Sequence, residues 1–250
     1  MGKINYDTIA LDYEKTRDIE DKVYKSIINI LDPQKNDCIM EYGCGTGNYL
    51  FAMSNSFTVR QFAGIEKSTN MANIAKQKVP AANIKIGSYQ DHVFPDNSFN
   101  KIFCIDTIHH IFDLSSFFSE IYSLLTKDGI FIICTETPRQ LKQKYWNTYF
   151  PSLYHADRNR FPTINRILNT SRKTGLVCEY IFSIQEEKKS VISDAMIKRI
   201  KNKTLSALYL ISENEYKAGK KKMEQDYHEK RIINQKEGYT FIVFRKENDI

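Results

Sequence analysis

The sequence lacks the features of a membrane protein, a disulfide-rich secreted protein or a zinc protein. No apolar run approaches the ~18 residues of a membrane-spanning helix, and residues 1–15 carry acids and polar side chains where a secretory signal has its apolar segment. The five cysteines are widely spaced and form no CxxC pair. We therefore expect reduced, mostly buried thiols, no metal site, and a soluble, cytoplasmic protein.

The composition is that of an ordinary globular protein. Of the 250 residues, 42% are hydrophobic and 26% are charged, which excludes a disordered chain and a collagen-like repeat. The net charge of +6 is unevenly spread: residues 1–185 hold 21 basic and 19 acidic side chains, whereas residues 186–237 hold 13 and 9. The basic excess therefore lies near the C-terminus, among many acids, which favours a solvated helix face over a nucleic-acid site.

Strand-like and helix-like segments alternate up to residue 135, which indicates βαβ units and a mainly parallel sheet. Residues 127–129 (KDG) predict a turn, and the polar, aromatic stretch 138–172 with its prolines predicts an insertion. The predicted strands are 37–42, 61–66, 83–87, 101–106, 130–135, 176–184 and 239–245. The predicted helices are 19–31, 47–54, 69–78, 114–126, 194–208 and 213–232.

A glycine loop, IMEYGCGTGN at residues 39–48, follows the first strand of this sheet and opens a helix. A doubly wound sheet binds nucleotide-like ligands at this place. The loop lacks the third glycine of the dinucleotide fingerprint, because Asn48 and Leu50 occupy the two candidate positions. Glu41 precedes the first glycine by two residues, and its carboxylate would repel a pyrophosphate but suits an amino group. The loop therefore predicts a ligand with a cationic end and no phosphates.

Glu66 closes the second predicted strand, 23 residues beyond Gly43. An acid at this position reaches the two hydroxyls of a ribose. Together with Glu41 and the glycine loop, it predicts a ligand that contains both a nucleoside and an amino group.

These motifs resemble those of the class I S-adenosylmethionine-dependent methyltransferases, in the small-molecule branch with a UbiE-like core (methyltransferase domain 11/25-like). The resemblance covers residues 6–135 by motif and the rest more loosely. The matching segments are Tyr6, Asp7, Ala10, Tyr13 and Arg17 in the lead-in, residues 41–47, Glu66, residues 87–99 (GSYQDHVFPDNSF), residues 105–111 (IDTIHHI) and residues 124–130 (LLTKDGI).

The resemblance implies an α/β fold: a Rossmann-like, doubly wound, mainly parallel seven-stranded sheet with an antiparallel last strand at 239–245, plus helical lid insertions. We expect a single domain over residues 1–250, with a cofactor-binding core at about 33–135. The lid and substrate elements are then expected at about 1–32, 138–172 and 190–235.

The resemblance also implies S-adenosylmethionine as cofactor and S-adenosylhomocysteine as product. Glu41 would then take the methionine amino group, Arg17 its carboxylate and Glu66 the ribose, while Tyr13 would close over the cofactor. Tyr89 stands where the family has a small residue, and stacking on adenine and packing in the core are equally open for it. The predicted cofactor-binding residues are Tyr13, Arg17, Glu41, Gly43, Cys44, Gly45, Gly47, Glu66, Lys67, Met71, Ser88, Tyr89, Gln90 and Ile105.

No residue stands out as the catalytic group. A general base is needed only if the acceptor arrives protonated, and the candidates are His109, Tyr154 and His155. The predicted function is methyl transfer by in-line displacement to a small-molecule acceptor. The alternatives are an RNA or protein methyltransferase that uses the basic C-terminal helices, with Lys220–Lys222 as phosphate contacts, and a catalytically silent cofactor-binding protein. The acceptor, the methylated atom and the oligomeric state are not specified by the sequence.

Overall fold

The computed structural model describes residues 6–247, and these fall into two compact units interleaved along the chain. Unit 1 takes the N-terminal segment up to Arg17, then Glu136–Pro162 and Ile184–Tyr239. Unit 2 takes Asp18–Thr135, Thr163–Ser183 and the segment from Thr240 onward. The single-domain organisation over residues 1–250 stays a prediction.

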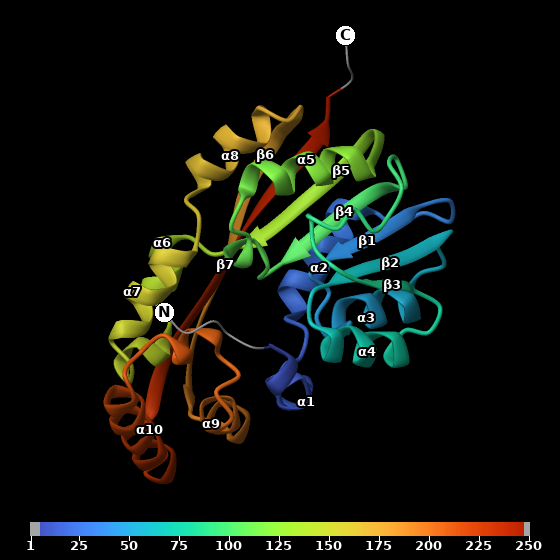
Figure 1. Ribbon diagram of the computed structural model, residues 1–250. Helices are drawn as coiled ribbons and strands as arrows, with labels where there is room; N and C mark the ends of the chain where they lie inside the picture. The colour runs from blue at the N-terminus through green and yellow to red at the C-terminus, as the bar shows by residue number, and fades with distance from the viewer. Residues whose placement is uncertain (1–5, 248–250) are drawn as a thin grey trace. The chain divides into compact units, whose positions relative to one another are not determined.

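Unit 2 is built on a seven-stranded sheet in the order β3-β2-β1-β4-β5-β7-β6 (Figure 1). The pairs β1–β2, β2–β3, β1–β4 and β4–β5 are parallel, and β7 runs antiparallel to β5. The mainly parallel sheet and its antiparallel last strand are thus confirmed. The strands are β1 (Cys38–Tyr42), β2 (Gln61–Glu66), β3 (Asn83–Ile86), β4 (Phe99–Ile105), β5 (Leu125–Thr135), β6 (Leu176–Val191) and β7 (Ile232–Lys246).

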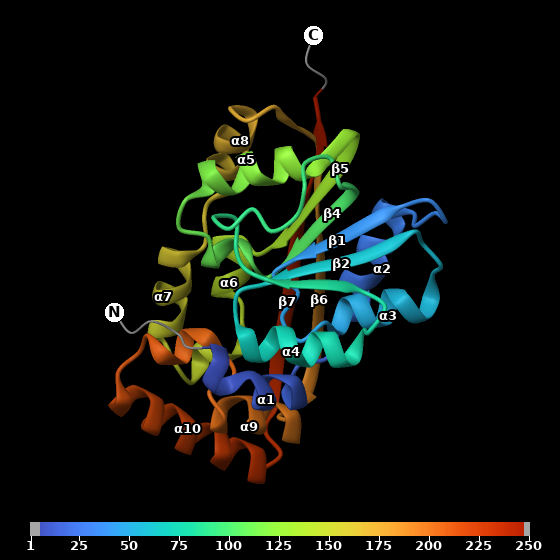
Figure 2. The same cartoon turned by 45° about the vertical axis from the view of Figure 1, so that its right-hand side comes forward.

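Helices of unit 2 cover both faces of this sheet. Helices α5 (Leu114–Leu124) and α8 (Ile164–Arg172) lie on one side, and α2 (Asp21–Leu31), α3 (Asn48–Ser56) and α4 (Thr69–Lys78) lie on the other (Figures 1 and 2). The apolar residues of each helix fall on one stripe and pack against strands that are buried on both faces. The core under α5 and α8 includes Phe117, Ile121, Phe131, Ile167 and Phe244, all fully buried.

Four of the elements that differ from the sequence-based expectation are α8, β5, β6 and β7. Helix α8 packs on α5 within unit 2 instead of belonging to an insertion, because Ile164, Ile167 and Leu168 form an apolar stripe. Strand β5 begins at Leu125 and so includes the residues predicted as a turn. Asp128 has a left-handed backbone there, and the register of β5 opposite β4 is irregular. Strands β6 and β7 are longer than predicted and continue into unit 1.

Unit 1 is helical around its own apolar cluster. Trp146, Phe150, Leu153, Ile200 and Met223 are among its buried members. The helices of this unit are α1 (Tyr6–Thr16), α6 (Pro138–Lys142), α7 (Ser152–Arg160), α9 (Asp194–Lys201) and α10 (Glu213–His228), with the 3₁₀ turns η2 (Tyr145–Thr148) and η3 (Ser206–Tyr209).

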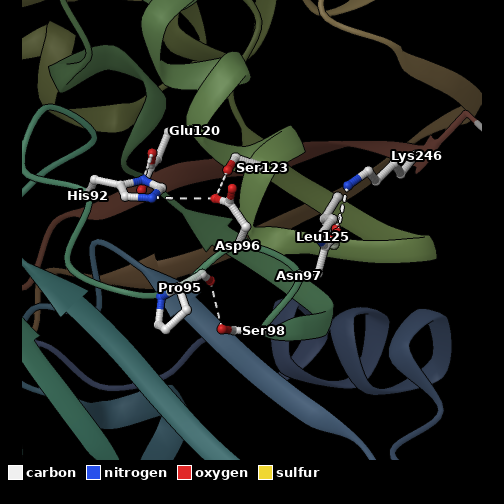
Figure 3. A network of polar contacts seen from close by, with 9 residues as sticks. All are labelled: His92, Pro95, Asp96, Asn97, Ser98, Glu120, Ser123, Leu125 and Lys246. Atoms are coloured by element: carbon white, nitrogen blue, oxygen red, sulfur yellow. Dashed lines mark hydrogen bonds and ion pairs between the residues drawn. The ribbon is translucent and has the colours of Figure 1, made fainter. Parts of the chain in front are cut away.

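The connection between β3 and β4 in unit 2 is held to α5 by polar contacts. Nδ1 of His92 lies 2.8 Å from Oε2 of Glu120, and its Nε2 lies 3.4 Å from Asp96, whose carboxylate accepts from Ser123 (Figure 3). Across residues 6–247, no helix combines the length and apolar character needed to cross a lipid bilayer.

Candidate functional site

The candidate site begins where β1, β2 and β4 end, at one edge of the sheet in unit 2. Glu41 lies beside Gly64 of β2 and Phe103 of β4 in the parallel register. The backbone N–H groups of Gly43 and Cys44 both donate to the carbonyl of Ile65, at 2.8 and 3.0 Å. The glycine loop therefore turns back over the end of β2 and leads into α3.

The loop is left-handed at its glycines, and the space beside them differs. A Cβ at Gly43, where φ is +73°, would lie 2.5 Å from Cγ2 of Thr107. At Gly45, where φ is +53°, a Cβ would meet nothing within 4 Å. Gly43 is thus required by packing against the chain, whereas the space at Gly45 is open to a ligand.

Glu66 is fixed by backbone donors from both sides. Gly45 donates to its Oε2 at 2.9 Å, and Ser68 donates to its Oε1 at 2.8 Å. Ser68 in turn caps α4 by accepting from the N–H of Met71 at 3.2 Å. The carboxylate is therefore held in one orientation at the end of β2, beside the open space at Gly45.

Glu41 is the most deeply buried acid of the site, with 3% of its surface exposed. Its Oε2 has no hydrogen-bond partner among the described residues. Burial raises the pKa of this carboxyl well above its usual range, the charge of Glu66 raises it further, and the N–H of Leu50 opposes the rise. A buried acceptor of this kind fits a cationic ligand group, because a cation would supply the missing donor and favour ionisation. The residues present therefore fit the amino group of S-adenosylmethionine.

The segment after β3 is shaped by Asp91, whose Oδ2 accepts from the N–H and the hydroxyl of Ser88 at 2.7 and 2.9 Å. The Tyr89 ring packs edge-on against Phe117 at 6.2 Å and contacts the core of unit 2. These contacts favour the packing alternative for Tyr89. Gln90 and Lys67 are exposed, whereas Cys44, Met71 and Ile105 are buried.

Asp106 is a further polar residue at this edge of the sheet, and it is not among the residues predicted from the sequence. It follows β4 directly, with a left-handed φ of 51°, and its N–H donates to the carbonyl of Cys134 at 3.1 Å. Its Oδ1 is buried and has no hydrogen-bond partner among residues 6–247. Asp106 follows the end of β4, the strand next to β1, whereas the spacing rule that pointed to Glu66 concerns the end of the second strand and gives no signal for Asp106.

The remaining predicted residues are divided between the units. His109 and His110 form the 3₁₀ turn η1 (Ile108–His110) in unit 2, with ring centroids 4.0 Å apart. Tyr154 and the exposed His155 belong to α7 in unit 1. Tyr13 and Arg17 also belong to unit 1, where the guanidinium of Arg17 lies 5.3 Å from the Tyr13 ring centroid. Their roles toward the cofactor stay predictions.

Lysines of the basic C-terminal stretch form ion pairs with nearby glutamates. Lys201 pairs with Glu224 at 3.3 Å and Lys203 with Glu213 at 3.2 Å. Lys222 lies 5.7 Å from the Tyr149 ring. Among residues 6–247, no group of three or more His, Cys, Asp or Glu side chains is arranged to hold a metal ion.

The chain is similar in sequence to known methyltransferases. A family model described as a methyltransferase domain matches residues 40–133. A methyltransferase-family protein of Bacillus subtilis, YrhH, is 31% identical over 140 residues, which cover 53% of this chain and 73% of YrhH. Phosphoethanolamine N-methyltransferase 3 of Arabidopsis thaliana is 29% identical over 113 residues, but the match spans 44% of this chain and only 23% of the plant enzyme.

A solved structure of a methyltransferase-family protein has the same fold as this chain. A solved methyltransferase-family structure from Anabaena variabilis superposes with a TM-score of 0.67 at 20% identity, covering 91% of this chain and 98% of that one. The chain therefore belongs to the class I S-adenosylmethionine-dependent methyltransferases.

Proposed function

We propose that the protein binds S-adenosylmethionine at the carboxyl edge of β1 and β2 and transfers its methyl group to a small-molecule acceptor. The observation that carries this proposal is the buried, unpartnered Oε2 of Glu41 beside the open space at Gly45. When bound, S-adenosylmethionine supplies a methyl group activated by a sulfonium centre. The chain's own residues then bind and orient this group.

Glu41 pairs with the amino group of the cofactor, and Glu66 accepts hydrogen bonds from the ribose hydroxyls. Gly45 lets the loop backbone approach without a side chain in the way. In-line displacement consumes positive charge, so the protein contributes mainly orientation and exclusion of water. His109 is the proposed base in unit 2 for an acceptor that arrives protonated, because it follows β4 at the same edge of the sheet.

The acceptor is proposed to be a small molecule. The similarity to phosphoethanolamine N-methyltransferase 3 supports this acceptor class. The ion pairs formed by Lys201 and Lys203 reduce the charge that an RNA-binding surface would need. A small molecule therefore remains the favoured acceptor over a nucleic acid.

Calorimetric titration with S-adenosylhomocysteine tests the cofactor site. We expect saturable binding by the wild-type chain and loss of that binding in Glu66→Ala. Absence of binding to the wild type would overturn the proposal. Transfer of a labelled methyl group to phosphoethanolamine, compared with transfer to bulk RNA, then tests the acceptor class. Transfer to RNA that is lost when Lys220–Lys222 are replaced by glutamine would establish the alternative.

A further inference from the structure

Helix α5 of unit 2 carries a buried acid, Glu120, that the cofactor motifs do not account for. Its side chain is 8% exposed and lies among the apolar residues of this helix. Oε2 lies 2.8 Å from Nδ1 of His92, whereas Oε1 is buried without a hydrogen-bond partner among residues 6–247. Within this part of the chain, His92 is therefore the group that pairs with the buried carboxylate.

His92 lies on the connection between β3 and β4, and its imidazole is directed toward α5 (Figure 3). Its φ of +44° is left-handed, a conformation that a residue with a side chain adopts only at an energetic cost. The contact with Glu120 offsets this cost, and Nε2 also lies 3.4 Å from Asp96. One point of the connection is thus fixed on α5.

The residues directly before this point form a compact turn that contains predicted cofactor-binding residues. Asp91 accepts from the N–H and the hydroxyl of Ser88, and its own N–H donates to the Ser88 carbonyl at 3.1 Å. Before the turn, the N–H of Gly87 donates to the carbonyl of Glu66 at 3.0 Å. The turn is therefore held to β2 beside the proposed ribose acid at one end and, through His92, to α5 at the other.

The contact that holds the α5 end depends on charge. Glu120 faces His92 from α5, and Asp96 faces it from its own segment. The hydrogen bond and charge of Glu120 raise the pKa of the imidazole, and Asp96 adds to the rise. Tyr42 of β1 is a further titratable group near Glu120, and burial raises the pKa of this phenol, so it is neutral at pH 7.

Two lysines lie near other residues of the same connection. Hydrogen bonds from Ser88 lower the pKa of Asp91, and the charge of Lys67 lowers it further. Lys246 donates to Oδ1 of Asn97 at 3.0 Å. These cations act on Asp91 and Asn97, so the acids Glu120 and Asp96 determine how firmly His92 is held.

Protonation of the imidazole strengthens this hold. A neutral imidazole donates one hydrogen bond, whereas the imidazolium donates from both nitrogens and carries a positive charge toward both acids. Charge-assisted hydrogen bonds are the stronger kind, and a carboxylate that is largely removed from water gains more from a cation than an exposed one does. A turn that is held in place before the ligand arrives loses less conformational freedom on binding.

We propose that His92 and Glu120 are positioning residues for the cofactor: they hold residues 88–91 in place beside Glu66, so that the nucleoside end of the cofactor binds more tightly when His92 is protonated. This inference rests on the proposed function and adds to it a pH-dependent support for the nucleoside end. Every group that it invokes belongs to unit 2.

Titration calorimetry with S-adenosylhomocysteine and with adenosine, at about pH 6 and about pH 8.5, tests the proposal. His92→Gln should weaken binding of both ligands by about three- to fivefold at the lower pH and by less than about twofold at the higher pH. Each variant is compared with the wild type at the same pH, because Glu41 also titrates. Equal affinities of His92→Gln and the wild type at the lower pH would overturn the proposal.

Two control variants limit the effect to this place. His228→Gln removes an exposed histidine of unit 1 and should bind both ligands as the wild type does at either pH. Glu41→Gln changes the proposed amino-group site and should bind adenosine within about twofold of the wild type. Adenosine therefore reports on the nucleoside end alone, where the His92–Glu120 pair is proposed to act.

Charge variants distinguish positioning from packing. Glu120→Gln keeps the shape and removes the charge, so it should match His92→Gln at the lower pH. His92→Lys keeps a cation at both pH values and should bind adenosine at about pH 8.5 at least as tightly as the wild type. Equal weakening of His92→Lys at both pH values would show a packing role and overturn the proposal. Circular dichroism confirms that each variant folds, and Glu120→Gln decides the question if a His92 variant does not.

Hydrogen exchange of the amides of residues 88–92 in the ligand-free protein separates this inference from the proposed function. These amides should exchange more slowly in the wild type than in His92→Gln at the lower pH. A wild type that binds neither ligand would sink the proposed function, and equal exchange in both proteins would then sink the holding of the turn as well. A wild type that binds both ligands with the affinities of His92→Gln would overturn this inference and leave the proposed function.

Discussion

The backbone N–H of Gly45 donates to Oε2 of Glu66 at 2.9 Å, so the acid at the end of β2 also holds the glycine loop in place. Ser68 donates to the other oxygen of the same carboxylate. One side chain therefore shapes the loop, and in the proposed function the same carboxylate accepts from the ribose hydroxyls. Removal of Glu66 should therefore weaken ligand binding by loosening the glycine loop and by removing the acceptor for the ribose hydroxyls.

Glu66→Ala should weaken binding of S-adenosylhomocysteine by about tenfold or more, since two or more hydrogen bonds of roughly 1 kcal/mol each are lost. Isothermal titration calorimetry measures this change. Glu179→Gln is the control, because Glu179 is a carboxylate of unit 2 that pairs with Arg245 on the far strands. Equal affinities for Glu66→Ala and the control would exclude Glu66 from the ligand site.

Glu41 should link the stability of the ligand-free protein to pH. Its pKa is raised in the folded state by burial and by Glu66, so the stability that the protonated form provides is present below the unfolded pKa. This stability is lost as the pH rises through the folded pKa. Glu41→Gln removes the ionisation and should raise the melting temperature at neutral pH, while the difference from the wild type narrows toward about pH 4.

The same substitution should weaken binding of S-adenosylhomocysteine by about tenfold, because an amide replaces the carboxylate that pairs with the amino group. Scanning calorimetry across the pH range and titration calorimetry at neutral pH give the two readouts. A variant that is less stable than the wild type at neutral pH and binds with unchanged affinity would contradict both expectations.

The sequence predicted the sheet and the cofactor end of the site well because both depend on local signals. Strand-length apolar runs, the glycine loop at 43–47 and acids at strand ends can be recognised without knowing the fold. The structure agrees on the position of Glu41 and Glu66 at adjacent strand ends. Asp106 follows the fourth strand, where the spacing rule for a ribose-binding acid does not apply, so no local signal pointed to it.

The second half of the chain was less predictable because its structure depends on tertiary contacts. Helix α8 was expected in an insertion, yet its apolar stripe completes the core under α5. The extra length of β6 and β7 could not be read from periodicity, since charged residues line much of their added length.

Two glycines of one loop should respond differently to the same substitution. Gly43→Ala places a Cβ 2.5 Å from Thr107 in a left-handed conformation, so it should lower the free energy of unfolding by about 2 kcal/mol or more. Gly45→Ala meets no atom within 4 Å and should cost only about 1 kcal/mol of left-handed strain.

Gly45→Ala should nevertheless weaken binding of S-adenosylhomocysteine, because its methyl group enters the space proposed for the ligand. Urea unfolding and titration calorimetry on both variants separate the effects. The proposed ligand position would be wrong if Gly45→Ala bound S-adenosylhomocysteine as tightly as the wild type does.

His92 should give the protein a second pH-dependent contribution to stability. The hydrogen bond and charge of Glu120, 2.8 Å from Nδ1, raise the pKa of this histidine, and Asp96 adds to the effect (Figure 3). A raised folded pKa means that the contribution is fully present below the unfolded value of about 6.5 and is lost as the pH rises through the folded value. His92→Gln should therefore lower the melting temperature at about pH 5.5 and have a smaller effect at about pH 8.5.

Glu120→Gln provides the matched test of the cause, since it removes the partner's charge and keeps its shape. In a Glu120→Gln background, the pH-dependent part of the His92→Gln effect should shrink to what Asp96 alone supplies. Melting temperatures of the wild type, both single variants and the double variant at the two pH values measure this coupling. An undiminished pH-dependent effect in that background would assign the raised pKa of His92 to Asp96, even though Nε2 lies 3.4 Å from it.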